Sequence, residues 1–308
     1  MHHRHVLPLA ALLLCGSALG TTVSSAPASP AAPASSADTP QRPLRILLTN
    51  DDGYDAPGIR MLYDRLTAAG HDVTIVAPLT NQSGAGTRIS SAPTIGVRHP
   101  GPKVWAVDGS PSDAVDFGLS AVFTRQAPDL VVSGTNFGPN LAALATHSGT
   151  VGAAVTAVEN GVPAVAVSTG GLEPPVPERI LNAMRPTNDF AVRLVARLRD
   201  RAHGGPLLPR GVGLDVDHPV LGPDGSGTAR GADLTTQDPH PVVKADYTDN
   251  GDGTWKVRVG VVDAPARPGT DVASVEAGRV SVSPITPGWN TTTADRRRTA
   301  GLLTGLRP

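Results

Sequence analysis

Residues 44–53 read Leu44-Arg45-Ile46-Leu47-Leu48-Thr49-Asn50-Asp51-Asp52-Gly53. The apolar run that ends at Thr49 predicts a short strand buried on both of its faces. The run then changes abruptly into a polar turn that carries two adjacent carboxylates. Beyond this turn Pro57 can take the first position of a helix that Gly70 ends, and the apolar side chains between them have helical spacing. These are Ile59, Leu62, Tyr63 and Leu66.

The same alternation of strand and helix continues along the chain. Residues 72–77 predict a second buried strand, which Pro78 ends, so the segment from Leu44 to Ala77 is expected to be a β-α-β unit with a right-handed crossover. Further predicted elements are strand 104–107, helix 110–123, strand 130–132, a helix from Ser148 to Gly161 and strand 164–167. This order predicts an α/β fold, a Rossmann-like, doubly wound domain with a mainly parallel sheet.

Composition limits the classes of partner. The chain has 308 residues, of which 40% are hydrophobic, so it can fill a sizeable core. Its 26 Lys and Arg nearly balance its 27 Asp and Glu, so no strong field of one sign would attract a nucleic-acid polymer or an anionic membrane. Anionic ligands must therefore be bound by local groups.

The first twenty residues are expected to be a signal peptide. They combine a basic start, an apolar stretch from Val6 to Leu14 and a small-residue cleavage site at 18–20. The following residues, 21–43, are rich in Ala, Ser and Pro and predict a disordered linker. The only cysteine, Cys15, lies in the signal peptide, and lipid attachment there is disfavoured because Leu14 precedes it. No other segment is long and apolar enough to span a membrane, so we expect a secreted or extracytoplasmic protein.

The chain changes character near residue 200. Residues 44–200 are expected to form the α/β catalytic domain, residues 201–290 a β-rich extension and residues 291–308 a C-terminal tail. Short strands are predicted near 212–216 and 255–261, and residues 250–253, Asn-Gly-Asp-Gly, predict a hairpin turn rather than a calcium-binding loop.

Three loops follow predicted strands, where ligands bind in an open parallel sheet. In the first, Asp51 and Asp52 would raise each other's pKa unless a cation neutralised them, and a hard divalent metal with oxygen ligands does so. The second loop, 81–88, offers hydroxyl and amide oxygens on a glycine-rich backbone. The third, 133–140, offers Asn136. Each loop alone is also consistent with an ordinary turn.

Together these segments resemble the SurE family of survival-protein nucleotidases and phosphatases. The matching pieces are residues 45–59, 76–78 with 81–84, 109–113, 129–136 with 138–140, and 148–154, followed by weaker matches at 162–168 and 278–285. The resemblance implies a 5′/3′-nucleotidase, an acid-phosphatase-like hydrolase that converts nucleoside monophosphates to nucleoside and phosphate. It also implies one divalent ion, Mg²⁺ or Mn²⁺ with other ions conceivable, and a homodimer or homotetramer in which residues 201–290 contribute to assembly.

The resemblance assigns roles to residues of this chain. It implies a metal site of Asp51, Asp52, Ser83 and Asn136, with Asp51, Asp52 and Asn50 catalytic. It places the substrate phosphate near Asn50, Gly84, Ser148, Gly149 and Thr150. The last three also begin a predicted helix, whose free N–H groups favour an anion, although an ordinary helix cap explains them equally well.

One loop departs from the family pattern. Relatives carry a glycine, an acidic and an aromatic residue where this chain reads Leu141-Ala142-Ala143-Leu144-Ala145-Thr146-His147. His147 could act in acid-base chemistry or fill the aromatic position. The departure keeps open an alternative, a secreted metal- or nucleotide-binding protein without turnover. A third candidate, an aspartyl-phosphate phosphatase, is disfavoured because it needs an acid two residues after the nucleophile, where this chain has Gly53.

Overall fold

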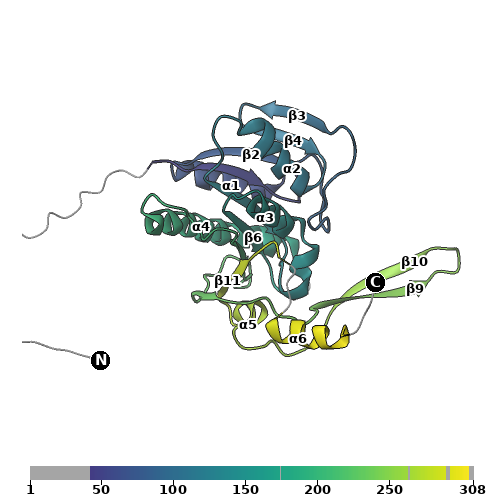
Figure 1. Ribbon diagram of the computed structural model, residues 1–308. Helices are drawn as coiled ribbons and strands as arrows, with labels where there is room; N and C mark the ends of the chain where they lie inside the picture. Colours follow the sequence, from purple (N-terminus) through teal and green to yellow (C-terminus); the bar gives the residue numbers. More distant parts are fainter. Residues whose placement is uncertain (1–41, 174, 263, 289–291, 305–308) are drawn as a thin grey trace, which may run out of the picture. The chain divides into compact units, whose positions relative to one another are not determined.

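The computed structural model describes residues 42–173, 175–262, 264–288 and 292–304 (Figure 1). Contacts divide the chain into two units, Met1–Arg42 and Pro43–Pro308. The predicted signal peptide, Cys15 and nearly all of the predicted linker lie outside the described residues. Within the described residues, no helix combines the length and apolar character needed to cross a membrane.

A nine-stranded sheet forms the centre of the described part of the second unit. Its spatial order is β3 (Gly96–Gly101), β4 (Val104–Asp108), β2 (Asp72–Pro78), β1 (Arg45–Thr49), β5 (Leu130–Phe137), β6 (Ala164–Thr169), β7 (Gly213–His218), β11 (Val280–Ile285) and β8 (Ala232–Leu234). The pairs from β4 to β7 are parallel, whereas β3 pairs antiparallel with β4 and β11 antiparallel with β7. The predicted α/β fold with a mainly parallel sheet is confirmed.

Helices cover both faces of this sheet (Figure 1). On one face lie α1 (Pro57–Ala68) and α4 (Pro177–Ala202), and on the other lie α2 (Pro111–Phe117) and α3 (Gly149–Glu159). Helix α1 begins with Pro57 and buries Ile59, Leu62 and Leu66, as the spacing predicted. In α2, Ser110 and Asp113 form a capping box that satisfies the first N–H groups.

Strand β5 is longer than the sequence indicated. The loop predicted for residues 133–140 is wrong over its first half, because β5 continues to Phe137 and Asn136 pairs with Ser168 on β6. Gly134 permits this close pairing, since a Cβ atom there would lie 2.3 Å from the carbonyl oxygen of Val167. Asn136 is therefore held by a strand rather than by a loop.

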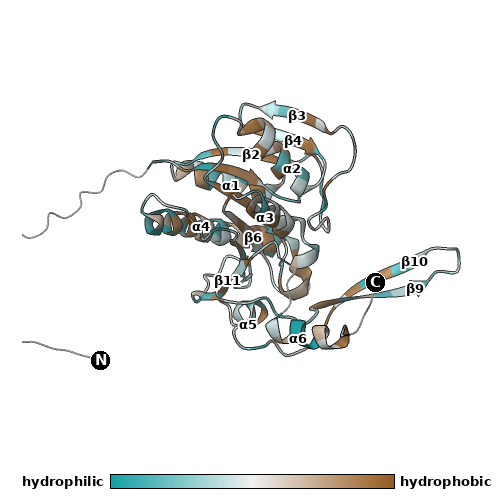
Figure 2. Ribbon diagram, in the orientation of Figure 1, coloured by the Kyte–Doolittle hydropathy of each residue, from teal (hydrophilic) through white to brown (hydrophobic). Residues whose placement is uncertain are grey.

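The region after residue 200 contributes both to the main sheet and to a separate hairpin. Strands β7, β8 and β11 join the main sheet, and α5 (Asp271–Glu276) precedes β11. Strands β9 (Val243–Asp249) and β10 (Trp255–Val261) form a second, two-stranded antiparallel sheet, which confirms the predicted hairpin turn between them. Helix α6 (Thr293–Leu302) follows near the C-terminus. Figure 2 shows apolar residues along the hairpin as well as in the core strands.

The strand order creates a ligand-binding position. From β1 the chain proceeds to β2 and β4 on one side, and β5, β6 and β7 follow on the other side. The order therefore reverses between β1 and β5, and the carboxyl ends of these two strands border the crevice in which doubly wound proteins bind ligands.

Candidate functional site

Asp51 follows β1 and is nearly fully buried against the start of α3. Its Oδ1 accepts a hydrogen bond of 2.6 Å from Thr150 Oγ1, and the backbone N–H groups of Gly149 and Thr150 also contribute hydrogen bonds. Burial raises the pKa of the Asp51 carboxyl, and these hydrogen bonds oppose the rise. A methyl group at Gly149 would lie 2.8 Å from Asp51 Cβ, so only glycine lets the helix approach so closely.

Asp52 lies beside it at the end of β5. Its Oδ2 accepts a hydrogen bond of 3.2 Å from the backbone N–H of Phe137. Burial raises the pKa of Asp52 to about 6, and the neighbouring charge of Asp51 adds to the rise. Two desolvated carboxyls therefore adjoin at the reversal point of the sheet, and a cation there would favour their charged forms.

Asn50 closes the turn itself. Its Nδ2 donates to the carbonyl of Gly53 at 2.9 Å, and its Oδ1 accepts from the N–H of Gly53 at 3.2 Å. Gly53 has a φ of +113°, which favours glycine. The structure thus engages both ends of the Asn50 amide in shaping the turn, and its catalytic or substrate role stays a prediction.

The second predicted loop docks directly on the first. The N–H of Gln82 donates to the carbonyl of Asp51 at 2.7 Å, and Asn81 Oδ1 accepts from the N–H of Ser83 at 2.8 Å. Ser83 and Gly84 are exposed at this junction. The backbone of Gln82 therefore holds the loop that carries Ser83 against Asp51, and a ligand role for the Ser83 hydroxyl stays a prediction.

Asn136 lies on β5, one residue before Phe137, whose backbone N–H holds Asp52. Its Nδ2 donates to the carbonyl of Gly138 at 3.0 Å, which leaves Oδ1 as the amide atom suited to a cation. The predicted donors thus come from the ends of β1, β2 and β5, and their joint coordination of an ion stays a prediction.

This donor set fits a hard divalent ion. Two carboxylates, a hydroxyl and an amide carbonyl supply only oxygen, the ligand type that Mg²⁺ and Mn²⁺ prefer. Among the described residues, no group of three or more His, Cys, Asp or Glu side chains is placed to hold a metal. A site at Asp51 and Asp52 must therefore complete its coordination with neutral oxygens and water, as Mg²⁺ sites commonly do.

The start of α3 binds an anion of the protein itself. Ser148 caps the helix by accepting from the N–H of Val151 at 3.1 Å, and the anion at its first turn is the Asp51 carboxylate. Both interpretations of this segment thus find support, a helix cap and an anion-binding N-terminus. Its contact with a substrate phosphate stays a prediction.

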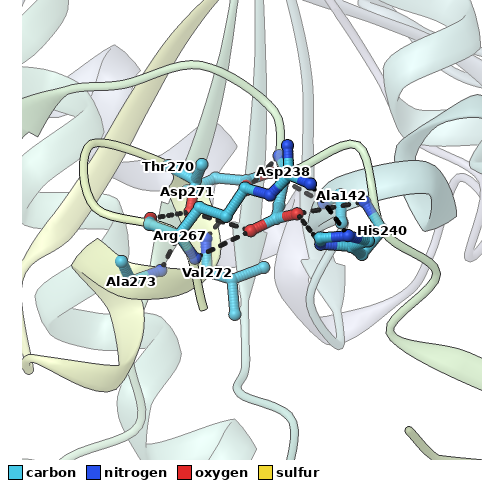
Figure 3. A network of polar contacts seen from close by, with 8 residues as sticks. All are labelled: Ala142, Asp238, His240, Arg267, Thr270, Asp271, Val272 and Ala273. Carbon is cyan, nitrogen blue, oxygen red and sulfur yellow. Dashed lines mark hydrogen bonds and ion pairs between the residues drawn. The ribbon is translucent and has the colours of Figure 1, made fainter. Parts of the chain in front are cut away.

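The departing loop is a 3₁₀ helix, η2 (Ala142–His147), that packs into a small apolar cluster. Leu141 and Ala142 are buried there against Val272 and Val275 of α5. The N–H of Ala142 donates to Asp271 Oδ2 at 2.7 Å, and Asp271 also accepts from the N–H groups of Asp238 and Val272 (Figure 3). His147 is exposed, and its carbonyl accepts from the N–H of Gly86. The loop therefore packs between α5 and the loop that contains Gly86, and it holds the two together.

Comparison with known proteins is decisive. Residues 46–256 match the family model described as survival protein SurE. The chain belongs to the SurE family. A "5′-nucleotidase SurE" of Natronomonas pharaonis is 38% identical over 257 residues, covering 80% of this chain and 94% of the relative. Another, from Thermosynechococcus vestitus, is 34% identical over 260 residues, with 79% and 91% covered. The crystal structure of the SurE protein from Aquifex aeolicus superposes with a TM-score of 0.68 at 29% identity, covering 84% of this chain and 98% of that one.

The SurE match includes every residue of the predicted metal site. The sequence did not reveal Phe137, whose backbone N–H holds Asp52, or Asp271, which lies outside the site and holds the loop at 141–147. The signal for Phe137 is its position directly after Asn136, because a strand that supplies one ligand also presents its next N–H to the same crevice. Asp271 had a weaker signal, a Thr-Asp pair at the start of a short helix far along the chain.

Proposed function

We propose that this protein is a metal-dependent phosphomonoesterase that hydrolyses nucleoside monophosphates to nucleoside and phosphate. The observation that carries the proposal is the pair of desolvated carboxyls, Asp51 and Asp52, at the reversal point of the sheet, where the segments of Ser83 and Asn136 adjoin them through backbone hydrogen bonds. The names of the relatives support a 5′-nucleotidase. Mg²⁺ or Mn²⁺ is the ion that this all-oxygen donor set suits best.

The reaction needs an attacking water and a stabilised leaving group. The water oxygen forms a bond to phosphorus, the bond from phosphorus to the ester oxygen breaks, and a proton from the water ends on the departing alcohol. A bound divalent ion would polarise the phosphoryl oxygens and lower the pKa of a bound water.

Asp51 and Asp52 would hold that ion and orient the water. The contacts that fix Asp51 to Thr150 and Asp52 to Phe137 keep both carboxylates in place before substrate arrives. Such preorganisation avoids the cost of ordering the ligands during the reaction.

A secreted binding protein without turnover remains the rival. It drew support from the altered loop at 141–147, but in the structure Leu141 and Ala142 are buried and pack against α5. The loop thus has a structural reason for its apolar residues, and the rival is not favoured by the relatives, which carry the name of an enzyme.

The decisive experiment measures phosphate release from AMP by the chain lacking residues 1–43. We expect turnover with Mg²⁺ or Mn²⁺, loss of turnover with EDTA, and at least a ~100-fold fall in kcat/KM for Asp51→Asn and for Asp52→Asn, because each removes a ligand charge. Asp55→Asn is the matched control, since Asp55 is exposed and forms an ion pair with Arg60. Absence of metal-dependent release from any phosphomonoester would overturn the proposal.

Two further parts of the proposal concern where the enzyme is located and how it assembles. We propose that the chain is exported by its N-terminal segment and that it assembles as a homodimer or homotetramer through its β-rich region. Both are tested below.

A further inference from the structure

A groove of about 1030 Å³ opens at the carboxyl ends of β5, β6 and β7. Its floor contains Phe137 and Pro139 after β5 and Pro219 to Leu221 after β7. Its walls come from the first turn of α4 and from Val259 to Val261 of β10. The volume is at the upper end of the range for small-molecule sites, about 300–1,000 Å³.

Phe137 joins this groove to the candidate metal site. Its backbone N–H donates to Asp52 Oδ2 at 3.2 Å, while its side chain is 37% exposed and lines the groove. A phosphate bound near Asp51 and Asp52 would therefore have its ester oxygen, and everything beyond it, within reach of the Phe137 ring.

The charges in the groove disfavour a polyanion. Glu173 and Glu276 line it together with one cation, Arg179, whose guanidinium lies 3.8 Å from Glu173. The remaining lining is mostly apolar or backbone. A neutral, flat leaving group would bury apolar surface here, whereas a second phosphate would meet an excess of carboxylate.

We propose that this groove binds the leaving group of the phosphomonoester, and that Phe137 selects esters whose leaving group is flat and largely apolar, such as a nucleoside or a naphthol. The inference rests on the proposed phosphomonoesterase and adds its specificity. Phe137 acts by packing against the leaving group, because aromatic rings associate by offset stacking or edge contacts.

The test compares 1-naphthyl phosphate, which has a flat leaving group, with glycerol 2-phosphate, which has a small polar one. The measured quantity is the ratio of their kcat/KM values. We expect Phe137→Ala to lower this ratio by ~10-fold.

Val176→Asp, at the opposite wall, should lower it as well. Val176 is 47% exposed and occupies the N-cap of α4, where Asp is a favourable residue, so the fold should tolerate the new charge. Leu234→Ala is the control: Leu234 is 79% exposed on β8, does not line the groove, and should leave the ratio unchanged.

An unchanged ratio in both groove variants would overturn the inference while leaving the phosphomonoesterase intact. A change of oligomeric state in Phe137→Ala, measured by light scattering, would overturn it too, because the groove would then be an interface between copies. If no ester is hydrolysed, the proposed function fails separately, and calorimetric titration with 1-naphthyl phosphate and Mg²⁺ then decides the groove. Weaker binding by Phe137→Ala than by Leu234→Ala supports it, and equal binding refutes it.

Discussion

Asp217 lies buried at the end of β7, outside the candidate metal site. Its Oδ1 accepts a hydrogen bond of 2.7 Å from the backbone N–H of Asn140, which in turn donates through Nδ2 to Ser168. Burial raises the pKa of Asp217 to about 7 from an ordinary value of 3.8, the Asn140 N–H lowers it and the charge of Asp271 raises it. The residue therefore positions the segment after β5 while keeping its proton in the folded state up to nearly neutral pH.

This shift predicts how stability depends on pH. Because the pKa is higher in the folded chain, the folded state holds a proton that the unfolded state releases above about pH 4, so the Asp217 contribution to stability falls as pH rises from about 4 to 7. Asp217→Asn keeps an acceptor for Asn140 but cannot ionise. We expect its free energy of unfolding at pH 7.5 to exceed that of the wild type, by at most about 4 kcal/mol at about 1.4 kcal/mol per pKa unit.

Thermal unfolding at pH 4.5 and at pH 7.5 checks this prediction. The advantage of Asp217→Asn should shrink to about 1 kcal/mol at pH 4.5, because the folded state keeps the proton there while the unfolded state, with its ordinary pKa of 3.8, has released most of it. Asp246→Asn, a change at an exposed carboxyl on the hairpin, serves as the control and should show no such dependence. An equal difference at both pH values would contradict the buried-acid explanation.

The sequence could predict the two carboxylates of the site but not what holds them. Asp51 and Asp52 stand out because the strand before them and the helix after them are encoded locally. Thr150, which fixes Asp51, is 99 residues away, and its contact depends on the close approach of α3 that Gly149 allows. Asn50 also bonds the backbone of its own turn, a contact that the sequence did not show, and its catalytic or substrate role stays a prediction.

At the scale of elements, prediction succeeded where apolar periodicity was clear. Strand β1, helix α1 and strand β2 were predicted with nearly their observed bounds, because the apolar residues in each of them follow the pattern expected for that type of element. The long helix α4 lacks such a clear pattern and was not predicted, because its interior contains Pro186 and its buried face includes polar residues such as Thr187 and Asn188. The Thr187 hydroxyl accepts from Thr169 and Asn188 Oδ1 accepts from Thr135, both on the sheet, and no local pattern can show these partners. Asn188 Nδ2 is buried without a hydrogen-bond partner among the described residues.

The hairpin of β9 and β10 exposes one apolar face. Trp255, Val257, Val259 and Val261 alternate along β10 and therefore share a face, and Tyr247 opposite Val257 extends it. Isolated two-stranded hairpins are marginally stable in water, and an exposed apolar patch commonly marks an interface. Val259 and Val261 also line the groove, so we propose that copies of the chain associate through the rest of this face, at Trp255, Val257 and Tyr247.

Val257→Asp should therefore shift the protein to a smaller species, because it buries an unpaired charge in the proposed interface. Arg258→Asp is the matched control, since it introduces the same carboxylate one residue along the strand, on the opposite face. Sedimentation equilibrium distinguishes the two variants, and we expect at least a ~10-fold weaker association for Val257→Asp only. The same molar mass for the wild type and Val257→Asp would count against the hairpin as an interface.

At the scale of the whole molecule, the main sheet contains strands from both ends of the described part of the chain. The parallel strands from β1 to β7 place the donors, and β11 then pairs antiparallel with β7, which requires no crossover helix. The alternation of strand and helix is therefore lost after residue 200 although the sheet continues. The composition of residues 201–290 predicted a β-rich extension, but it could not show that β7, β8 and β11 join the same sheet as the earlier strands.

The proposed export signal, residues 1–20, lies outside the described residues and is tested by experiment. If residues 1–20 are a signal peptide, the exported protein should begin at Thr21, and mass spectrometry of protein collected outside the cytoplasm should find that N-terminus.

Replacing Leu13 by Arg interrupts the apolar stretch from Val6 to Leu14, so export should fail and the chain should keep residues 1–20. Ser29→Arg, which adds the same charge beyond the proposed cleavage site, is the control and should be exported and cleaved. Because the candidate site begins only at Asn50, all three proteins should hydrolyse the same substrates once purified, so a difference confined to their location would identify residues 1–20 as an export signal. Recovery of the full chain, uncleaved and inside the cell, would show instead that the enzyme acts on intracellular nucleotides.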